Sequence, residues 1–236
     1  MNLSRARRSS IYQFGFLLVL ALAWICYRPA LSGVFQLDDA GNIADLAFIE
    51  DTSTATDFVL AGKAGPLGRP IALLTFALQA DHWEQGASAF LRLNILLHLL
   101  NSLLLAACLY LLSRLREVDR SKAILVATVA ASMWVVMPLL ASASLLVVQR
   151  MTTLSAMFSL LGLGGYLLAR RRIGDSPTSA LVWMSVSLLV GTLLAALCKE
   201  SGLLMPTLVL ALEATVLSRP TSLDTRIWRY WQGTFL

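Results

Sequence analysis

The sequence predicts an all-α, polytopic membrane protein with about six transmembrane helices. Hydrophobic residues make up 57% of the 236-residue chain and charged residues only 14%, and the mean hydropathy is +0.71. A water-soluble domain of this length is rarely so apolar, and long apolar runs predict membrane-spanning helices. We therefore expect one membrane domain over residues 1–236, with a single long loop over residues 33–89.

Six apolar runs are long enough to be candidate spans. A basic segment precedes the first run, as in a signal peptide, but this run is too long for one and no small-residue cleavage site follows it. We therefore expect an uncleaved anchor. The fourth and sixth runs are short, which leaves their ends poorly defined. The runs are Tyr12–Leu31, Phe90–Leu112, Ala123–Val147, Thr152–Ala169, Ala180–Leu197 and Leu203–Leu217.

Lysine and arginine residues predict the orientation. With a cytoplasmic N-terminus, 13 of the 19 basic residues lie in cytoplasmic segments and 6 on the other side. Cytoplasmic loops are enriched in these residues, so this orientation is favoured, and we expect a bacterial inner membrane. These charges also explain the pI of 9.4 without nucleic-acid binding. The 6 residues outside are Arg28, Lys63, Arg69, Arg92, Arg150 and Lys199.

The loop from Gly33 to Ala89 is far longer than a simple connection and contains eight of the fourteen acidic residues. Its apolar patches, Ile43–Ile49 and Ile71–Leu78, are too short to span a bilayer and predict helices that lie in the membrane interface. Pro70 suits the first turn of the second helix. The adjacent acids Asp38 and Asp39 open this loop, and carboxylates at a membrane boundary usually have a function.

Polar residues in the second run have two interpretations. Asn94, His98 and Asn101 are spaced i, i+4 and i+7, so they share one helical face. They form either a polar seam that bonds a neighbouring helix, which is the commoner role, or part of a site. Arg92 lies nearer the surface and is either a site residue or an interface anchor that extends its charge to water.

Two further motifs map to the same membrane face. Arg150 begins the fourth run, and both a helix N-terminus and a guanidinium fork attract phosphate. The alternative is a lone arginine that anchors the helix end. Lys199 lies outside, against the positive-inside trend, and is followed by Glu200. That pair is either part of a site or a tight turn whose charges neutralise each other.

The order of these motifs resembles the GT-C enzymes of protein O-glycosylation, in particular the transmembrane-and-tetratricopeptide-repeat O-mannosyltransferases and bacterial pilin-glycosylating relatives. The resemblance runs over nearly the whole chain. It departs at Leu91 and Met137, where the family often has histidine. Such enzymes are longer, so the chain is expected to be an N-terminal part of one. The matching segments are residues 35–39, 68–78, 93–101, 148–152 and 199–206.

The resemblance implies transfer of a sugar from a polyprenyl-phosphate carrier to a hydroxyl acceptor, a protein Ser/Thr or a lipid or glycan, at the extracytoplasmic face. One aspartate would be the general base, and Asp39 is favoured over Asp38. The other could hold a partner or a divalent metal, Mg²⁺ or Mn²⁺. Cationic groups would hold the leaving phosphate. The candidates for this role are Arg150, Arg69 and Lys199; further site candidates are His98, Asn94, Glu200 and Arg92.

Two other functions stay open. One is a non-catalytic membrane subunit that binds a lipid carrier or a partner protein. The other is half of a transporter or lipid flippase. Transporters place ionisable groups near the membrane midplane, whereas the ionisable residues here gather at one face, which favours interfacial chemistry.

Overall fold

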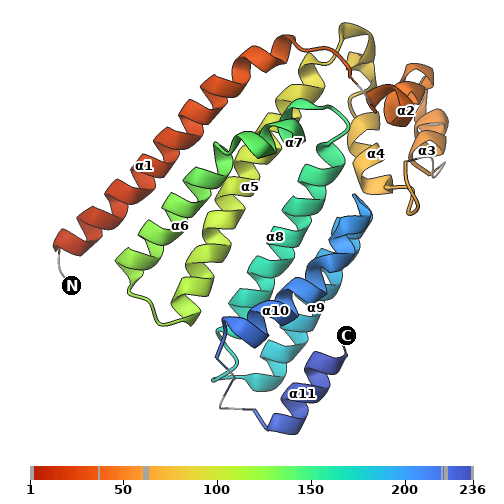
Figure 1. Cartoon of the computed structure of the whole chain (residues 1–236). Helices are drawn as coiled ribbons and strands as arrows, with labels where there is room; N and C mark the ends of the chain where they lie inside the picture. Colours follow the sequence, from red (N-terminus) through yellow and green to blue (C-terminus); the bar gives the residue numbers. More distant parts are fainter. Residues whose placement is uncertain (1–2, 37, 61–63, 219, 221–222, 235–236) are drawn as a thin grey trace.

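The computed structural model describes residues 3–36, 38–60, 64–218, 220 and 223–234, and these contain helices and turns but no strand. The all-α class is therefore confirmed. Five long helices lie side by side: α8 packs against α9 and α5, α5 against α6, and α6 against α1 (Figure 1). The five are α1 (Leu3–Tyr27), α5 (Ser88–Leu115), α6 (Arg120–Val135), α8 (Arg150–Arg170) and α9 (Pro177–Ala196).

Length and composition make this a multi-pass membrane protein with four or five candidate spans among the described residues. Four uninterrupted helices are long and apolar enough: Arg7–Ser32, Ser88–Leu115, Arg150–Arg170 and Pro177–Ala196. A fifth candidate is a bent pair, Arg120–Val135 with Pro138–Leu145, whose two parts meet at 58°. Six spans are not confirmed.

The third predicted run is not one continuous helix. Helix α6 ends at Val135, and Met137 has an extended backbone with ψ of 119°. A residue before proline avoids the helical conformation, and Pro138 then begins the short helix η4 (Pro138–Leu140). The chain continues in α7 (Ala141–Leu145), which crosses the end of the bundle toward α8 (Figure 1).

The sixth predicted run forms η5 (Glu200–Leu204) and α10 (Met205–Thr215). Helix α10 has 11 residues, about 16 Å, which is too short to cross a bilayer. It follows α8 back toward the other end of the bundle, where Glu213 pairs with Arg170. The last helix, α11 (Thr225–Gly233), packs there through Trp228 and Trp231, and its Trp231 Nε1 donates to Ser185 Oγ at 2.9 Å.

The segment over residues 33–89 packs on one end of the bundle, opposite the N-terminus (Figure 1). Its core contains Ile43, Leu46 and Phe76 together with Phe90 from α5. Pro70 lies in the first turn of its helix, as predicted, whereas the helix over 52–60 was not predicted. The elements are α2 (Asp39–Ile43), η2 (Ala44–Phe48), α3 (Thr52–Leu60), α4 (Pro70–Ala77) and η3 (Ala80–Gln85).

Helices α8 and α9 approach closely at two facing glycines. A Cβ at Gly162 would lie 2.9 Å from the Gly191 Cα and 2.6 Å from the Met205 Cε. A Cβ at Gly164 would meet only the Cys108 Sγ, at 3.7 Å. Of these two α8 glycines, Gly162 is therefore the one that the contact with Gly191 requires, as is common where transmembrane helices pack on small residues.

We expect Gly162→Ala to destabilise the bundle by about 1–3 kcal/mol, because the added methyl group pushes α8 away from α9. Gly164→Ala is the matched control and should be neutral or slightly stabilising, because alanine is the better helix former. Thermal unfolding of both variants in detergent measures the difference. Equal melting temperatures for the two would contradict the close contact at Gly162.

Candidate functional site

The N-terminal part of α8 and the connection before it bring the sequence motifs together. We call residues 146–153 the α8 N-terminal segment. Side chains separated by up to 160 positions in the sequence, from residue 39 to residue 199, contact it. The contacts join Asp39 to Val148, Arg69 to Met151, Asn94 to Leu146 and Val147, and Lys199 to Thr152.

Asp39 is buried, with 1% of its surface exposed. Its Oδ1 accepts a hydrogen bond from the Val148 N–H at 2.7 Å, and its Oδ2 accepts one from the Gln36 N–H at 2.8 Å. Buried backbone N–H groups require an acceptor, and this carboxylate supplies one for each segment. Asp39 therefore joins the start of α2 to the α8 N-terminal segment.

Asp38 is exposed, whereas Asp39 is buried, so the two adjacent side chains differ in their access to solvent. Its backbone carbonyl accepts from the Asn42 side chain at 2.8 Å and from the Asn42 N–H at 3.2 Å, which fixes the main chain at this residue. A hydroxyl group that approaches from solvent can reach the Asp38 carboxylate, whereas the Asp39 carboxylate is covered.

Arg150 is completely buried, and its guanidinium binds neutral acceptors. Its Nε donates to Asn94 Oδ1 at 2.9 Å, and its two Nη atoms donate to the Thr75 and Phe90 carbonyls at 3.0 Å each. The guanidinium carbon lies 4.3 Å from the centre of the Phe76 ring. In this structure Arg150 does not present its fork to a phosphate, because apolar packing of α4 and α5 encloses the group.

The predicted anion site at the N-terminus of α8 is also closed. The N–H groups of Arg150, Met151 and Thr152 donate to the carbonyls three residues earlier, at 3.1, 3.2 and 2.9 Å. Amides that are used in such tight turns are not available to a phosphate.

Arg69, Lys199 and Glu200 form a partly exposed charged group, which we call the cationic pair with its acid. Arg69 Nη2 lies 2.8 Å from Glu200 Oε2, and Arg69 Nη1 contacts Met151. Lys199 Nζ donates to Thr152 Oγ1 at 2.7 Å, and that hydroxyl donates to Gln149 Oε1 at 2.6 Å. Three separate parts of the sequence thus meet beside α8.

The backbone at Arg69 is unusual for a residue with a side chain. It has φ of 51° and follows Gly68 at φ of 69°. Left-handed residues other than glycine cost free energy and occur where surrounding contacts fix them. Here the ion pair with Glu200 fixes Arg69 immediately before α4, so that its guanidinium faces the α8 N-terminal segment.

Burial and then the neighbouring Arg69 charge lower the pKa of Lys199, while Glu200 opposes this shift. The hydrogen bond from Arg69 lowers the pKa of Glu200. The group therefore contains two positive charges close together and only one carboxylate. An added anion would reduce the repulsion between the Arg69 and Lys199 charges.

We expect the Arg69–Glu200 pair to make a small, acid-sensitive contribution to stability. The side chains are 19% and 27% exposed, so solvent limits the contribution to about 1 kcal/mol or less. Because the folded pKa of Glu200 is lowered, the contribution is complete above the ordinary glutamate pKa of about 4.3 and is lost as pH falls through the folded value. Melting temperatures of wild type and Arg69→Gln should therefore differ near neutral pH and converge in acid. A constant difference would contradict this origin.

The polar face of α5 is a seam between helices rather than part of the charged group. His98 is 1% exposed, and its Nε2 lies 3.1 Å from the Val135 carbonyl. Its ring stacks on Trp134 at 4.7 Å. Asn101 donates to the Thr153 carbonyl at 2.8 Å. Arg92 is exposed near the start of α5 and remains outside these contacts. His98 and Asn101 therefore bond neighbouring helices, which is the first of the two roles that their spacing indicated.

A divalent metal does not fit the buried Asp39 carboxylate in this structure. Both Asp39 oxygens face N–H donors, which leaves no open side for a cation. Within the described ranges, no three or more His, Cys, Asp or Glu residues converge as a metal site. No step below uses a metal.

One buried ionic group was not predicted. At the opposite end of α8, Arg170 Nε lies 2.9 Å from Glu213 Oε1, and the Tyr166 hydroxyl donates to the same oxygen at 2.7 Å. Trp228 lies 5.1 Å from the Arg170 guanidinium carbon. The sequence signal was Glu213, the one acidic residue in the sixth apolar run. This group fastens α10 and α11 to α8.

Comparisons with known proteins do not assign a family. No protein-family model matches this chain, and no curated protein or solved structure matches it either. A function for this chain therefore has to be inferred from the contacts of its own residues.

Proposed function

We propose that this chain is the membrane part of a GT-C-like glycosyltransferase, which transfers a sugar from a polyprenyl-phosphate carrier to a hydroxyl group of a protein, lipid or glycan. One observation carries the proposal: the same α8 N-terminal segment is tied to the aspartate pair and to the cationic pair with its acid. A base for the acceptor and cations for a leaving phosphate are the two groups that this reaction needs.

In the proposed reaction, the general base is the exposed Asp38 and not the buried Asp39, which the family resemblance favours. The acceptor hydroxyl gives its proton to the Asp38 carboxylate, and its oxygen forms the new bond to the anomeric carbon. The bond from that carbon to the carrier phosphate breaks, and the sugar is inverted. The phosphate leaves with the electron pair, and Arg69 and Lys199 balance its charge. Asp39 is a positioning residue that fixes the backbone beside Asp38.

The proposed orientation places the N-terminus in the cytoplasm and the charged group at the extracytoplasmic face of a bacterial inner membrane. The distribution of lysine and arginine supports it. In this orientation the short helices of residues 39–85 lie at the outer membrane interface, close to a carrier whose phosphate is at the same level.

A non-catalytic subunit that binds a lipid carrier is the second candidate. It is favoured because most charged groups of the site already bind other groups of the protein. Asp39 binds backbone amides, Arg150 binds carbonyls, and Glu200 pairs with Arg69. A transporter is less well supported, because the buried ionic groups lie near the two ends of the bundle rather than between them.

Lys199→Met tests the proposal, because methionine keeps the length of the side chain and removes its charge. We expect roughly tenfold weaker binding of a polyprenyl-phosphate sugar in proteoliposomes, from the loss of one charge-assisted contact, and slower transfer. Arg172→Met changes an exposed residue after the end of α8; it is the control and should bind as wild type does. If Lys199→Met binds the donor as wild type does, the cationic pair does not contribute to binding of the phosphate. Normal binding without transfer by wild type would favour the subunit.

A further inference from the structure

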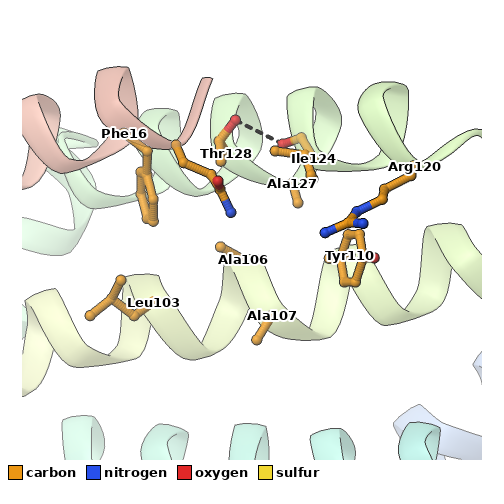
Figure 2. A pocket seen from close by; sticks show the side chains of 10 residues that line it. Phe16, Leu103, Ala106, Ala107, Tyr110, Arg120, Ile124, Ala127 and Thr128 are labelled. Carbon is orange, nitrogen blue, oxygen red and sulfur yellow. Dashed lines mark hydrogen bonds between the residues drawn. The ribbon is translucent and has the colours of Figure 1, made fainter. Parts of the chain in front are cut away.

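A hollow on the membrane-facing side of the bundle lies far from the charged group described above. It has a volume of about 350 Å³ and is bounded by α1, α5 and α6. Figure 2 shows α5 and α6 facing each other across it, with Phe16, Ala106 and Arg120 directed into the space between them. On α6, lining residues from Arg120 to Thr128 extend over about 12 Å of helix. The hollow therefore has the shape of a short channel that runs along the helices.

Small side chains create this space. Ala106 and Ala107 of α5 and Ala127 of α6 line its middle, where leucines would fill it. Helix α1 packs mainly on α6 and makes few contacts with α5, so the hollow remains open toward lipid between α1 and α5. In a membrane, an apolar space that opens toward lipid is accessible to an acyl chain.

The two ends of the hollow differ in polarity. Figure 2 shows Arg120 beside the Tyr110 ring at one end and Phe16 and Leu103 at the other. Thr128, between these ends, uses its hydroxyl in its own helix by donating to the Ile124 carbonyl at 2.8 Å. Gln13 of α1 is a further polar lining residue. The hollow thus has a cationic end and an apolar end, which matches an amphiphile with a negative head group.

The cationic end has an excess of positive charge. Arg120 is exposed, and its side chain makes no hydrogen bond or ion pair in the part of the chain that the structure describes. Arg8 and Lys122 lie at the same end and line a neighbouring depression together with Asp119. Asp119 is the acid that faces them, and one of its oxygens accepts from the Ser121 N–H at 2.9 Å. Three cations and one acid favour an anion here.

We propose that this hollow binds an anionic phospholipid, with its phosphate at Arg120 and one acyl chain between α1 and α5. The guanidinium fork provides two parallel donors for phosphate oxygens. The apolar floor from Ala107 to Phe16 removes part of the acyl chain from the mobile lipid around it. The site is independent of the proposed glycosyl transfer and lies near the start of α6, away from the α8 N-terminal segment.

Native mass spectrometry of the purified full chain tests the proposal by counting the lipids that remain bound. Phosphatidylglycerol should be retained in preference to phosphatidylcholine. Arg120→Gln should weaken phosphatidylglycerol binding roughly tenfold, since a charge-assisted contact is lost. Ala107→Leu should weaken it to a similar degree, because the side chain fills the hollow. Glycerol phosphate, which has the anion but no acyl chain, should not displace the lipid.

Two matched control variants distinguish lipid binding in the hollow from non-specific binding of lipid elsewhere on the protein. Arg171→Gln removes an exposed charge elsewhere, and Ala21→Leu enlarges an exposed alanine of α1 outside the hollow; both should bind lipid as wild type does. Circular dichroism verifies the helical fold of each variant. Equal retention of the two lipids by wild type would overturn the proposal, as would wild-type binding by Arg120→Gln or Ala107→Leu. A dimer that Ala107→Leu dissociates would show that a second copy of the chain occupies the hollow instead.

Discussion

Arg150→Ala should destabilise the protein by about 3–5 kcal/mol, because three buried acceptors lose charge-assisted hydrogen bonds and a cavity is left. These acceptors are Asn94 Oδ1 and the Thr75 and Phe90 carbonyls, which belong to α4 and α5. The loss should therefore loosen the attachment of α4 to the bundle. Thermal unfolding and the yield of monodisperse protein in detergent measure the effect.

Arg150→Lys is the informative second variant. From the sequence, this change is expected to weaken donor binding while leaving expression intact. The structure reverses the expectation: one ammonium group cannot reach three acceptors around a planar fork, so we expect a loss of about 2 kcal/mol. Arg92→Ala, an exposed arginine of α5, serves as control and should melt as wild type does. If Arg150→Lys keeps full stability but loses donor binding, the phosphate role is restored.

Asp38→Asn should lower the rate of sugar transfer by at least about 10²-fold without changing the melting temperature. An amide cannot accept the proton of the acceptor hydroxyl, and the residue is exposed, so the fold tolerates the change. The assay uses a polyprenyl-phosphate sugar as the donor, and it measures both transfer and donor binding. Donor binding should persist, because Arg69 and Lys199 are unchanged.

Asp39→Asn should behave differently from Asp38→Asn. One amide NH₂ group would face the N–H of Gln36 or Val148, so a buried donor loses its acceptor at a cost of about 1–3 kcal/mol. Transfer should fall together with stability. If Asp39→Asn is stable but inactive and Asp38→Asn is active, the base is Asp39. Full transfer by both variants would support the subunit instead.

Local sequence patterns predicted those features that depend on neighbours along one helix. The membrane class followed from apolar runs, and four of the six predicted runs correspond to uninterrupted candidate spans. The face shared by Asn94, His98 and Asn101 followed from helical spacing alone. Pro70 gave the start of α4. In each case the determining interaction lies within a few residues of sequence.

The short helices of the loop were only partly predictable. Helix α3 contains Thr52 and Asp57 and lacks an apolar run, so nothing in its composition distinguished it from a connection. Pro138 was visible in the sequence, but the bend that it introduces into the third run was not predicted. The angle between α6 and α7 depends on how Ser144 and its neighbours pack against other helices.

The sequence by itself determined that the chain is a helical membrane protein and that its unusual charges gather at one end of the bundle. Only the tertiary structure decided which charges are buried. Asp38 and Asp39 are chemically identical, and Arg69 and Arg150 differ only in position. The burial of Asp39, Arg69 and Arg150 is set by contacts with residues 56 to 131 positions away, such as Asp39 with Val148 and Arg69 with Glu200. Burial is a property of packing between distant segments, and no local pattern in the sequence encodes it.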